Sequence, residues 1–196
     1  MVYNGVSREY FPLLEIGVLE QVLFVGARSG YKNFESVVRA LAGLKDLSLV
    51  CVGGGSFSNS ERELLESNIP NRYRHAGFLS NAQLNYEYNR SLCLVYPSLY
   101  EGFGIPVLES MRAGCPVIAV NSSSIPEVAG SAAILMENGD VEEIKAAITY
   151  VMVNENRRDL VEKGFGQSRN FDWDKTFIKT ISIYEEVLGK TLLVEK

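Results

Sequence analysis

Short apolar runs alternate with amphipathic stretches along this 196-residue chain. Runs that are apolar at successive positions are typical of parallel strands buried on both faces. The pattern predicts strands over 21–26, 47–55, 72–78, 92–98, 115–120 and 132–136. Elsewhere apolar positions recur three and four residues apart, which predicts helices over 33–44, 58–67, 80–91, 105–114, 140–153, 155–169 and about 173–188.

The alternation of strands with helices predicts an α/β fold with a doubly wound parallel sheet, Rossmann-like in form. Ser58 and Ser80 stand where they could cap the helices that follow them. Residues 1–196 contain no internal repeat, linker or low-complexity tract, so we expect a single domain, and 189–196 show no clear element. Ligands of such folds bind beyond the carboxyl ends of the strands, so the loops there are where a site is expected.

Composition narrows the function classes. The net charge of −5 and the pI of about 5.1 argue against a general nucleic-acid-binding surface. No apolar run reaches the roughly 18 residues that span a bilayer, and the N-terminus does not resemble a signal peptide. Cys51, Cys93 and Cys115 lie in or beside expected buried strands, which favours structural thiols in a reducing compartment over a disulfide or metal framework.

The loop "VGARSGYKNF" (25–34) follows the first expected strand and carries Arg28 and Lys32. A helix is expected to begin near Asn33, so two cations and a helix N-terminus would converge on one volume, which suits a phosphate group. The alternative is that both cations are ordinary solvated loop residues. The loop is not a P-loop, because Gly-x-x-x-x-Gly-Lys-Ser/Thr is absent.

A second glycine-bearing loop, "VGGGSFSNS" (52–60), begins as Gly-x-Gly, but Ser58 stands where the dinucleotide fingerprint has its third glycine. It therefore gives only weak support to a nicotinamide-dependent enzyme that binds at Gly53–Gly55. Simple termination of the strand explains the glycines equally well.

The segment "EGFGIPVLE" carries the sharpest chemical signal. Pro106 suits the first position of a helix, while Gly102 and Gly104 permit unusual backbone geometry and expose N–H groups at the positive helix end. Glu101 then precedes the helix and Glu109 lies about one turn inside it. Carboxylates accept paired hydrogen bonds from vicinal hydroxyls, so sugar or ribose hydroxyls are natural partners. Complementing the helix dipole would explain Glu109, but not the two glycines.

The sequence "PSLYEGFGIPVLESMRAGCPVIA" (97–119) resembles the Glu-x7-Glu segment of retaining nucleotide-sugar glycosyltransferases of the GT-B fold, family four. The other segments of that family follow in order. "VYNGV" is similar to the hinge segment, "HAGFLSNAQLNYEYNRS" to the base-binding stretch, and "SSSIPEVAGSAAIL" and "FDWDKTFIKTISIYEEVL" to the closing segments. The resemblance covers about residues 2–188 and implies the donor-binding half of a GT-B enzyme.

The resemblance also implies residue roles. Glu101, the implied catalytic residue, would contact hydroxyls of the donor sugar, and Glu109 the ribose. Arg28 and Lys32 would neutralise the diphosphate, so that no metal or other cofactor is expected. The full set of donor-binding residues that the resemblance implies is Arg28, Lys32, Phe78, Leu79, Gly102, Phe103, Gly104, Ile105 and Glu109.

Within that set, Phe78 and Leu79 would frame the base, and the N–H groups of Phe103 and Gly104 would meet the sugar and phosphates. One position departs from the family pattern. Many relatives have arginine directly after the loop glycine, where this chain has Ala27 and places Arg28 one residue later.

A larger departure is that the N-terminal acceptor-binding domain of the family is missing. The resemblance implies that the full-length protein transfers a hexose, with mannose as one candidate, from a GDP- or UDP-sugar to a glycan or lipid-linked acceptor. We expect a cytoplasmic protein without a nucleic-acid partner, whose membrane contact, if any, comes through the missing half. The isolated domain is expected to transfer little sugar.

Two alternative functions are a non-catalytic sugar-nucleotide-binding module and, with less support, a domain of an NAD-dependent oxidoreductase. "DWD" (172–174) matches the Asp-x-Asp of metal-dependent glycosyltransferases, but a helix follows it, so Asp172 or Asp174 is expected to be a helix cap. His75 is expected to be a structural or surface residue rather than a general base.

Overall fold

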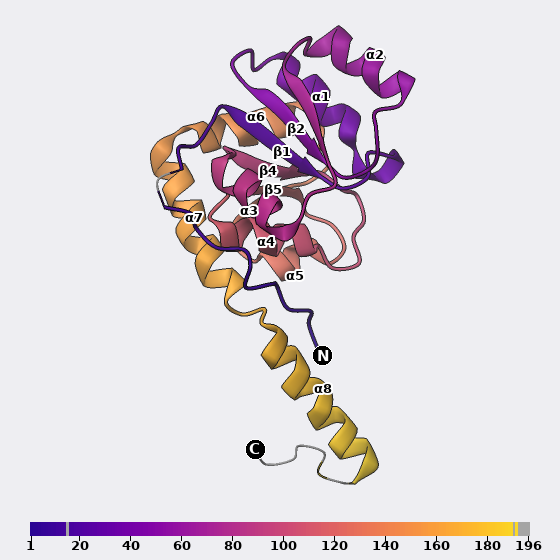
Figure 1. Cartoon of the computed structure of the whole chain (residues 1–196), viewed down its shortest axis with the longest axis vertical. Helices are drawn as coiled ribbons and strands as arrows, with labels where there is room; N and C mark the ends of the chain where they lie inside the picture. The colour runs from indigo at the N-terminus through magenta and orange to yellow at the C-terminus, as the bar shows by residue number, and fades with distance from the viewer. Residues whose placement is uncertain (15, 190, 192–196) are drawn as a thin grey trace.

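The computed structural model describes residues 1–14, 16–189 and 191. Its centre is a six-stranded sheet in the order β3-β2-β1-β4-β5-β6, with every neighbouring pair parallel (Figure 1). The strands are β1 (Gln21–Val25), β2 (Ser48–Val52), β3 (Tyr73–Gly77), β4 (Cys93–Tyr96), β5 (Val117–Val120) and β6 (Ala133–Met136).

Helices connect and cover these strands. They are α1 (Phe34–Ala42), α2 (Asn59–Asn68), α3 (Asn81–Arg90), α4 (Ile105–Ala113), α5 (Ile125–Ala129), α6 (Val141–Met152), α7 (Asn154–Ser168) and α8 (Trp173–Leu188), with a 3-10 turn, η1 (Gly30–Lys32), before α1. Capping boxes begin α2, α3 and α6, built on Ser58, Ser80 and Asp140.

Two apolar clusters fill the space on the two faces of the sheet, because side chains alternate along each strand. Val22 and Phe24 of β1 face the cluster that contains α1, α2 and α6, whereas Leu23 faces the cluster that contains α3, α4 and α5. Cys93 and Leu94 divide in the same way on β4. Both faces of the central strands are therefore buried, which is why their sequences are apolar at successive positions.

The order of the sheet reverses between β1 and β4. The chain leaves β1 toward α1 on one face and leaves β4 toward α4 on the other. At such a switch point the two connections diverge and leave a crevice at the carboxyl ends of the strands. The loops after β1 and β4 are consequently the two that meet where ligands of this architecture bind.

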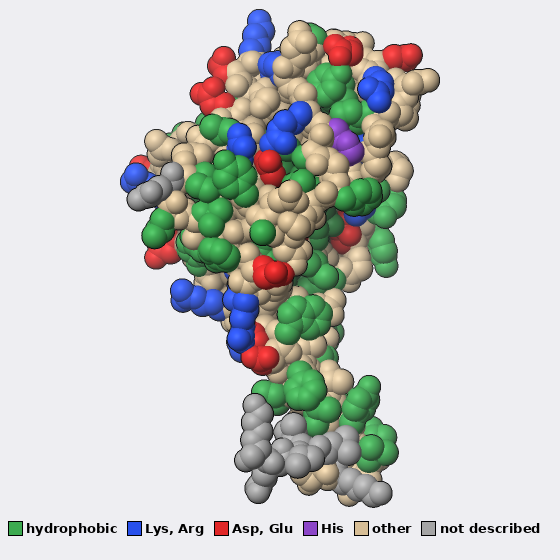
Figure 2. Space-filling model, viewed as in Figure 1, with side chains coloured by type: hydrophobic (Ala, Val, Ile, Leu, Met, Phe, Trp, Pro, Cys, Tyr) green, Lys and Arg blue, Asp and Glu red, His purple; other side chains and the backbone are tan. Residues whose placement is uncertain are grey.

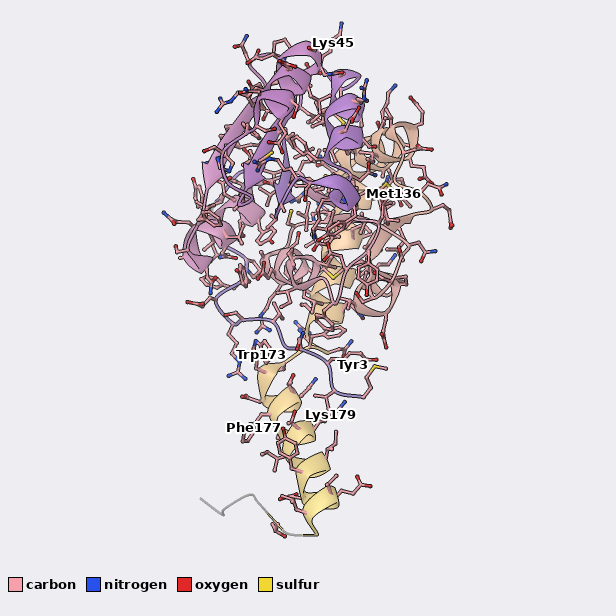
Figure 3. All side chains as sticks on the ribbon, turned by 90° about the vertical axis from the view of Figure 1, so that its right-hand side faces the viewer. Tyr3, Lys45, Met136, Trp173, Phe177 and Lys179 are labelled. Carbon is pink, nitrogen blue, oxygen red and sulfur yellow. The ribbon has the colours of Figure 1, made fainter. Side chains whose placement is uncertain are left out.

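The N-terminal segment begins beside the start of α8 and runs from there along the domain toward β1. Val6 N–H donates to Phe171 O at 3.1 Å, and Thr176 Oγ1 donates to Tyr3 O at 2.7 Å. Tyr3 and Trp173 lie at the level where α8 leaves the body (Figure 3). From there α8 extends away from the sheet, and no residue of this helix is buried (Figure 1).

The expected strands and helices are confirmed, with ends that differ by at most three residues. The structure adds η1 and α5, which the pattern did not predict because so short a segment repeats no apolar period. Asp172 caps α8 by accepting from Asp174 N–H, as expected. Cys51, Cys93 and Cys115 are buried and free. Most of 189–196 lies outside the described residues.

Gly5 sits where the N-terminal segment crosses the start of α8, and this contact allows no side chain. A Cβ on Gly5 would lie 2.4 Å from Trp173 N. We expect Gly5→Ala to lower the free energy of unfolding by roughly 1–3 kcal/mol, because backbone must move to make room. Urea denaturation followed by circular dichroism measures it. Gly17→Ala is the matched control, since a Cβ there meets nothing within 4 Å, and equal stability of the two variants would contradict the close contact.

Candidate functional site

Lys32 and Glu101 meet at the switch point of the sheet. The Lys32 ammonium group, at the end of η1, forms an ion pair with the Glu101 carboxylate, which follows β4. Each side chain is only 12% exposed. The ammonium also lies 5.2 Å from the ring centre of Tyr31 and 5.3 Å from that of Tyr96, so two aromatic faces flank it. Two sequence-predicted site residues from distant loops are thus brought into direct contact.

Hydrogen bonds hold the loops that carry this pair. Leu99 N–H donates to Tyr31 O at 2.8 Å and joins the loop after β4 to η1. Glu101 N–H donates to Ser123 Oγ at 2.9 Å, and Ser124 Oγ donates to Glu101 O at 3.0 Å. The loop after β5 therefore fixes the backbone of Glu101, from which the carboxylate extends.

The helices that begin at the switch point have bare N-termini. Neither α1, preceded by Asn33, nor α4, preceded by Gly104, has a side-chain cap, in contrast to α2, α3 and α6. The first N–H groups of these helices lack intrahelical partners and lie at the positive end of the helix dipole. Anionic groups are stabilised at such ends, so the crevice between β1 and β4 is suited to phosphate.

Gly104 has no room for a side chain and adopts a backbone conformation that favours glycine. Its φ is +94°, and a Cβ would lie 2.6 Å from Ile125 Cδ1. Gly102, in contrast, faces open space. Between these glycines lies Phe103, whose ring centre is 5.9 Å from that of Phe171. This contact between the rings anchors the loop.

Glu109 lies one turn inside α4 and accepts a hydrogen bond from the hydroxyl of Tyr88 at 3.0 Å. Burial raises the pKa of the Glu109 carboxyl, although hydrogen bonds from Tyr88 and Tyr10 act in the opposite direction. Among the described residues, Glu109 forms neither a hydrogen bond nor an ion pair with Lys32 or Glu101, so the two carboxylates have separate partners.

Arg28 does not join that pair, although the resemblance implied that it neutralises the diphosphate together with Lys32. Its side chain is 2% exposed and Nε pairs with Glu61 at 2.9 Å. The remaining nitrogens donate to the backbone oxygens of Gly53, Gly54, Gly55 and Ser56 at 2.7–3.3 Å. The guanidinium thus holds the loop after β2 in place, and this arrangement gives Arg28 a structural role.

The same contacts determine that the triple-glycine loop turns carbonyl oxygens, and not N–H groups, toward Arg28. Gly53, Gly54 and Gly55 all have positive φ, which turns their carbonyl oxygens toward Arg28. His75 Nε2 contacts Gly53 O at 2.9 Å and is a structural residue, as expected. A dinucleotide-binding loop presents N–H groups to a pyrophosphate, whereas this loop presents oxygens to a buried cation. The geometry therefore gives no support to a nicotinamide site at Gly53–Gly55.

Phe78 and Leu79 follow the carboxyl end of β3. Phe78 is 85% exposed, whereas Leu79 packs against the cluster on the α3–α4–α5 face. An exposed aromatic side chain at the carboxyl end of a strand is compatible with stacking on a base. Among the described residues, no group of three or more His, Cys, Asp and Glu side chains could hold a metal ion.

A family comparison shows the family to which the chain belongs. The model of the family described as "Glycosyl transferases group 1" matches residues 12–166. The chain belongs to the group 1 glycosyl transferases. Residues 12–166 of this glycosyl transferase chain include the loops that carry Arg28, Lys32 and the two glutamates, but not α8.

Relatives and solved structures agree with that family. The chain is 36% identical over 113 residues to the O-antigen chain mannosyltransferase B of Escherichia coli, which is 57% of this chain and 30% of that protein. It is 28% identical over 190 residues to an uncharacterized glycosyltransferase of Methanocaldococcus jannaschii, 95% of this chain and 53% of the relative.

Among solved structures, sucrose-phosphate synthase from Thermosynechococcus elongatus superimposes with a TM-score of 0.81 at 21% identity, covering 95% of this glycosyl transferase chain and 52% of the other. Anabaena HepE, solved in complex with UDP and glucose, gives a TM-score of 0.76 at 20% identity, covering 92% and 56%. The chain therefore spans about half of these structures and shares their GT-B fold. No helix in the described part of the chain is both long and apolar enough to cross a membrane.

Several residues of this site were not singled out from the sequence. Tyr88, Tyr96, Ser123 and Ser124 contact the two glutamates from other elements. Burial and the hydrogen bond with Glu101 raise the pKa of the Tyr96 hydroxyl, so this group stays a neutral donor. Serines after a strand and tyrosines in apolar runs are common in any α/β fold, so the sequence offered no signal that distinguishes them.

The structural role of Arg28 is open to a direct test. We expect Arg28→Ala to lower the free energy of unfolding by about 3–5 kcal/mol, because it leaves Glu61 and four carbonyl oxygens without their partner. Arg39→Ala, which removes an exposed i,i+4 pair with Glu35, is the control and should cost about 0.5 kcal/mol or less. Chemical denaturation of both variants measures the difference. An Arg28→Ala protein as stable as the control would contradict the structural role of Arg28.

Proposed function

We propose that this chain is the donor-binding domain of a retaining glycosyltransferase that uses a nucleotide-diphospho-sugar. The observation that carries the proposal is the contact of Lys32 with Glu101 at the switch point. A cation for a diphosphate and a carboxylate for sugar hydroxyls thereby share one crevice, flanked by the bare N-termini of α1 and α4.

In this proposal the diphosphate lies at the two helix N-termini and against the Lys32 ammonium. Its negative charge grows as the bond to the sugar breaks, so donors that are fixed in advance stabilise the transition state more than the ground state. Lys32, the N–H groups of Phe103 and Gly104, and the two helix ends supply that positive potential. Arg28 acts only through the loop that it holds.

The two carboxylates take separate roles. Glu101 accepts hydrogen bonds from hydroxyls of the donor sugar, and Glu109, deeper in α4, accepts them from the ribose. Without a ligand Lys32 and Glu101 neutralise each other; with the donor bound, a phosphate oxygen and sugar hydroxyls replace these partners. The empty site is thus charge-balanced, which lowers the cost of keeping it preformed.

The relatives suggest the substrate class. Several are named mannosyltransferases, and one solved neighbour binds UDP and glucose. We infer a hexosyltransferase acting on a glycan or lipid-linked acceptor, in which an N-terminal domain outside this chain binds the acceptor. The chain alone would then bind donor and transfer little sugar. A non-catalytic module would share the binding but not the transfer.

Calorimetric titration with UDP and GDP tests the site. We expect Lys32→Ala to weaken binding of the preferred nucleotide by about tenfold to a hundredfold, because a charge-assisted contact with phosphate is lost. Glu109→Gln should weaken it by about tenfold through the ribose. Lys163→Ala is the control, since Lys163 pairs with Asp159 on the far surface of α7. Equal affinities for all four proteins would refute the site.

The raised pKa of Glu109 predicts a pH dependence. The carboxylate must be ionised to accept from ribose hydroxyls, so affinity should fall as the pH drops through a pKa that lies above the ordinary glutamate value. The diphosphate itself titrates near pH ~6, so the Glu109→Gln protein supplies the reference curve. We expect the wild-type affinity to lose more than that of Glu109→Gln between neutral and mildly acidic pH. Parallel curves would argue against this role of Glu109.

A further inference from the structure

Residues 5–13, which we name the N-terminal strap, reach the Glu109 carboxylate through two tyrosines. Tyr88 of α3 is fully buried and its hydroxyl donates to Glu109 Oε2 at 3.0 Å. Tyr10 of the strap is 2% exposed, and its ring lies edge-on to that of Tyr88 with centres 5.9 Å apart. The strap therefore forms one wall around the buried tyrosine that holds Glu109.

A row of asparagines fixes the strap on α3. Asn81, Asn85 and Asn89 are spaced by four residues and so lie on one helix face. Their side-chain oxygens accept from the Tyr10 hydroxyl at 3.2 Å, from Phe11 N–H at 3.1 Å and from Leu13 N–H at 2.7 Å. Asn89 also donates to Phe11 O at 3.0 Å. A chain without secondary structure is thus held at successive backbone groups.

This arrangement does more than packing requires. A phenylalanine at position 88 or 10 would fill the same space, yet both rings carry hydroxyl groups in a region where an unpaired polar group is costly. The Tyr88 hydroxyl donates to Glu109, and the Tyr10 hydroxyl donates to Asn81 and also interacts with Glu109. Side-chain hydrogen bonds to a half-buried carboxylate fix its rotamer, and a carboxylate that binds vicinal hydroxyls depends on its orientation.

We propose that Tyr88 and the strap residue Tyr10 are positioning residues for Glu109, so that the N-terminal strap sets the affinity of the site for the ribose of the nucleotide. This inference rests on the proposed function, because it assigns the ribose to Glu109. Tyr88 acts by direct donation to the carboxylate. Tyr10 acts through the interaction of its own hydroxyl with Glu109, through the ring of Tyr88 and through the asparagine row that keeps the strap in place.

The experiment compares GDP and UDP with their 2′-deoxy forms by calorimetry on the whole chain. We expect Tyr88→Phe to bind the preferred ribonucleotide about tenfold more weakly and to discriminate less between it and its 2′-deoxy form. Tyr10→Phe should show the same two changes at about threefold. A purely structural role would alter the melting temperature and leave the discrimination unchanged.

Tyr73→Phe is the matched control. Its hydroxyl also donates to a carboxylate, that of Glu66, but between β3 and α2 and away from α4, so affinity and discrimination should both match wild type. Should Tyr88→Phe fold poorly, Tyr10→Phe and Asn85→Ala carry the test, since Asn85→Ala removes the hydrogen bond from Phe11 N–H of the strap and keeps both tyrosines.

The outcomes separate this inference from the proposed function. If Glu109→Gln weakens nucleotide binding while Tyr88→Phe, Tyr10→Phe and Asn85→Ala keep wild-type affinity and discrimination, the positioning role is wrong and the site stands. If Glu109→Gln itself has no effect, the ribose assignment is wrong and the inference falls with it.

Discussion

The ion pair between Lys32 and Glu101 is the constraint around which the site is built. It joins the carboxyl ends of β1 and β4, the neighbouring strands whose helices depart to opposite faces of the sheet. Both side chains are largely removed from water, so either charge alone would carry a desolvation cost of several kcal/mol. Each offsets that cost for the other, and two tyrosine rings complete the shell. The contact thereby joins the two loops that line the crevice.

The N-terminal segment connects the two halves of this site. Near its start, the ring of Tyr3 lies 6.4 Å from Phe103 in the loop of Glu101. Further on, Tyr10 packs against Tyr88, which holds Glu109. Both carboxylates therefore have a neighbour that leads back to the same piece of irregular chain. That chain in turn is fixed at the beginning of α8, through Phe171 and Thr176.

The sequence predicted the sheet because burial on both faces leaves a simple mark, namely successive apolar residues in β1, β2, β4 and β5. It also predicted the caps at Ser58 and Ser80, since a cap depends only on residues nearby in the chain. The proximity of Lys32 to Glu101 was expected from topology, because both residues follow the carboxyl ends of parallel strands.

Arg28 shows where such reasoning stops. A loop cation is visible in the sequence, but its direction depends on three glycine carbonyls that turn inward from another loop. The contact of Tyr88 with Glu109 was equally hidden, because it joins α3 to α4 across 21 positions and no local pattern records it. The sequence identified the elements and the chemical groups, whereas the choice of partners depended on tertiary packing.

The exposure of the last helix, α8, bears on the stability of that helix. Apolar side chains such as Phe177, Tyr184 and Val187 cover much of α8 and face solvent (Figure 2). An isolated helix of this length is only marginally stable in water, and packing normally supplies most of the stability. No residue of α8 is buried, so packing contributes little to its stability. Its outer amides should therefore exchange with deuterium nearly as fast as those of an unfolded peptide, and slow down only when apolar surface covers the helix.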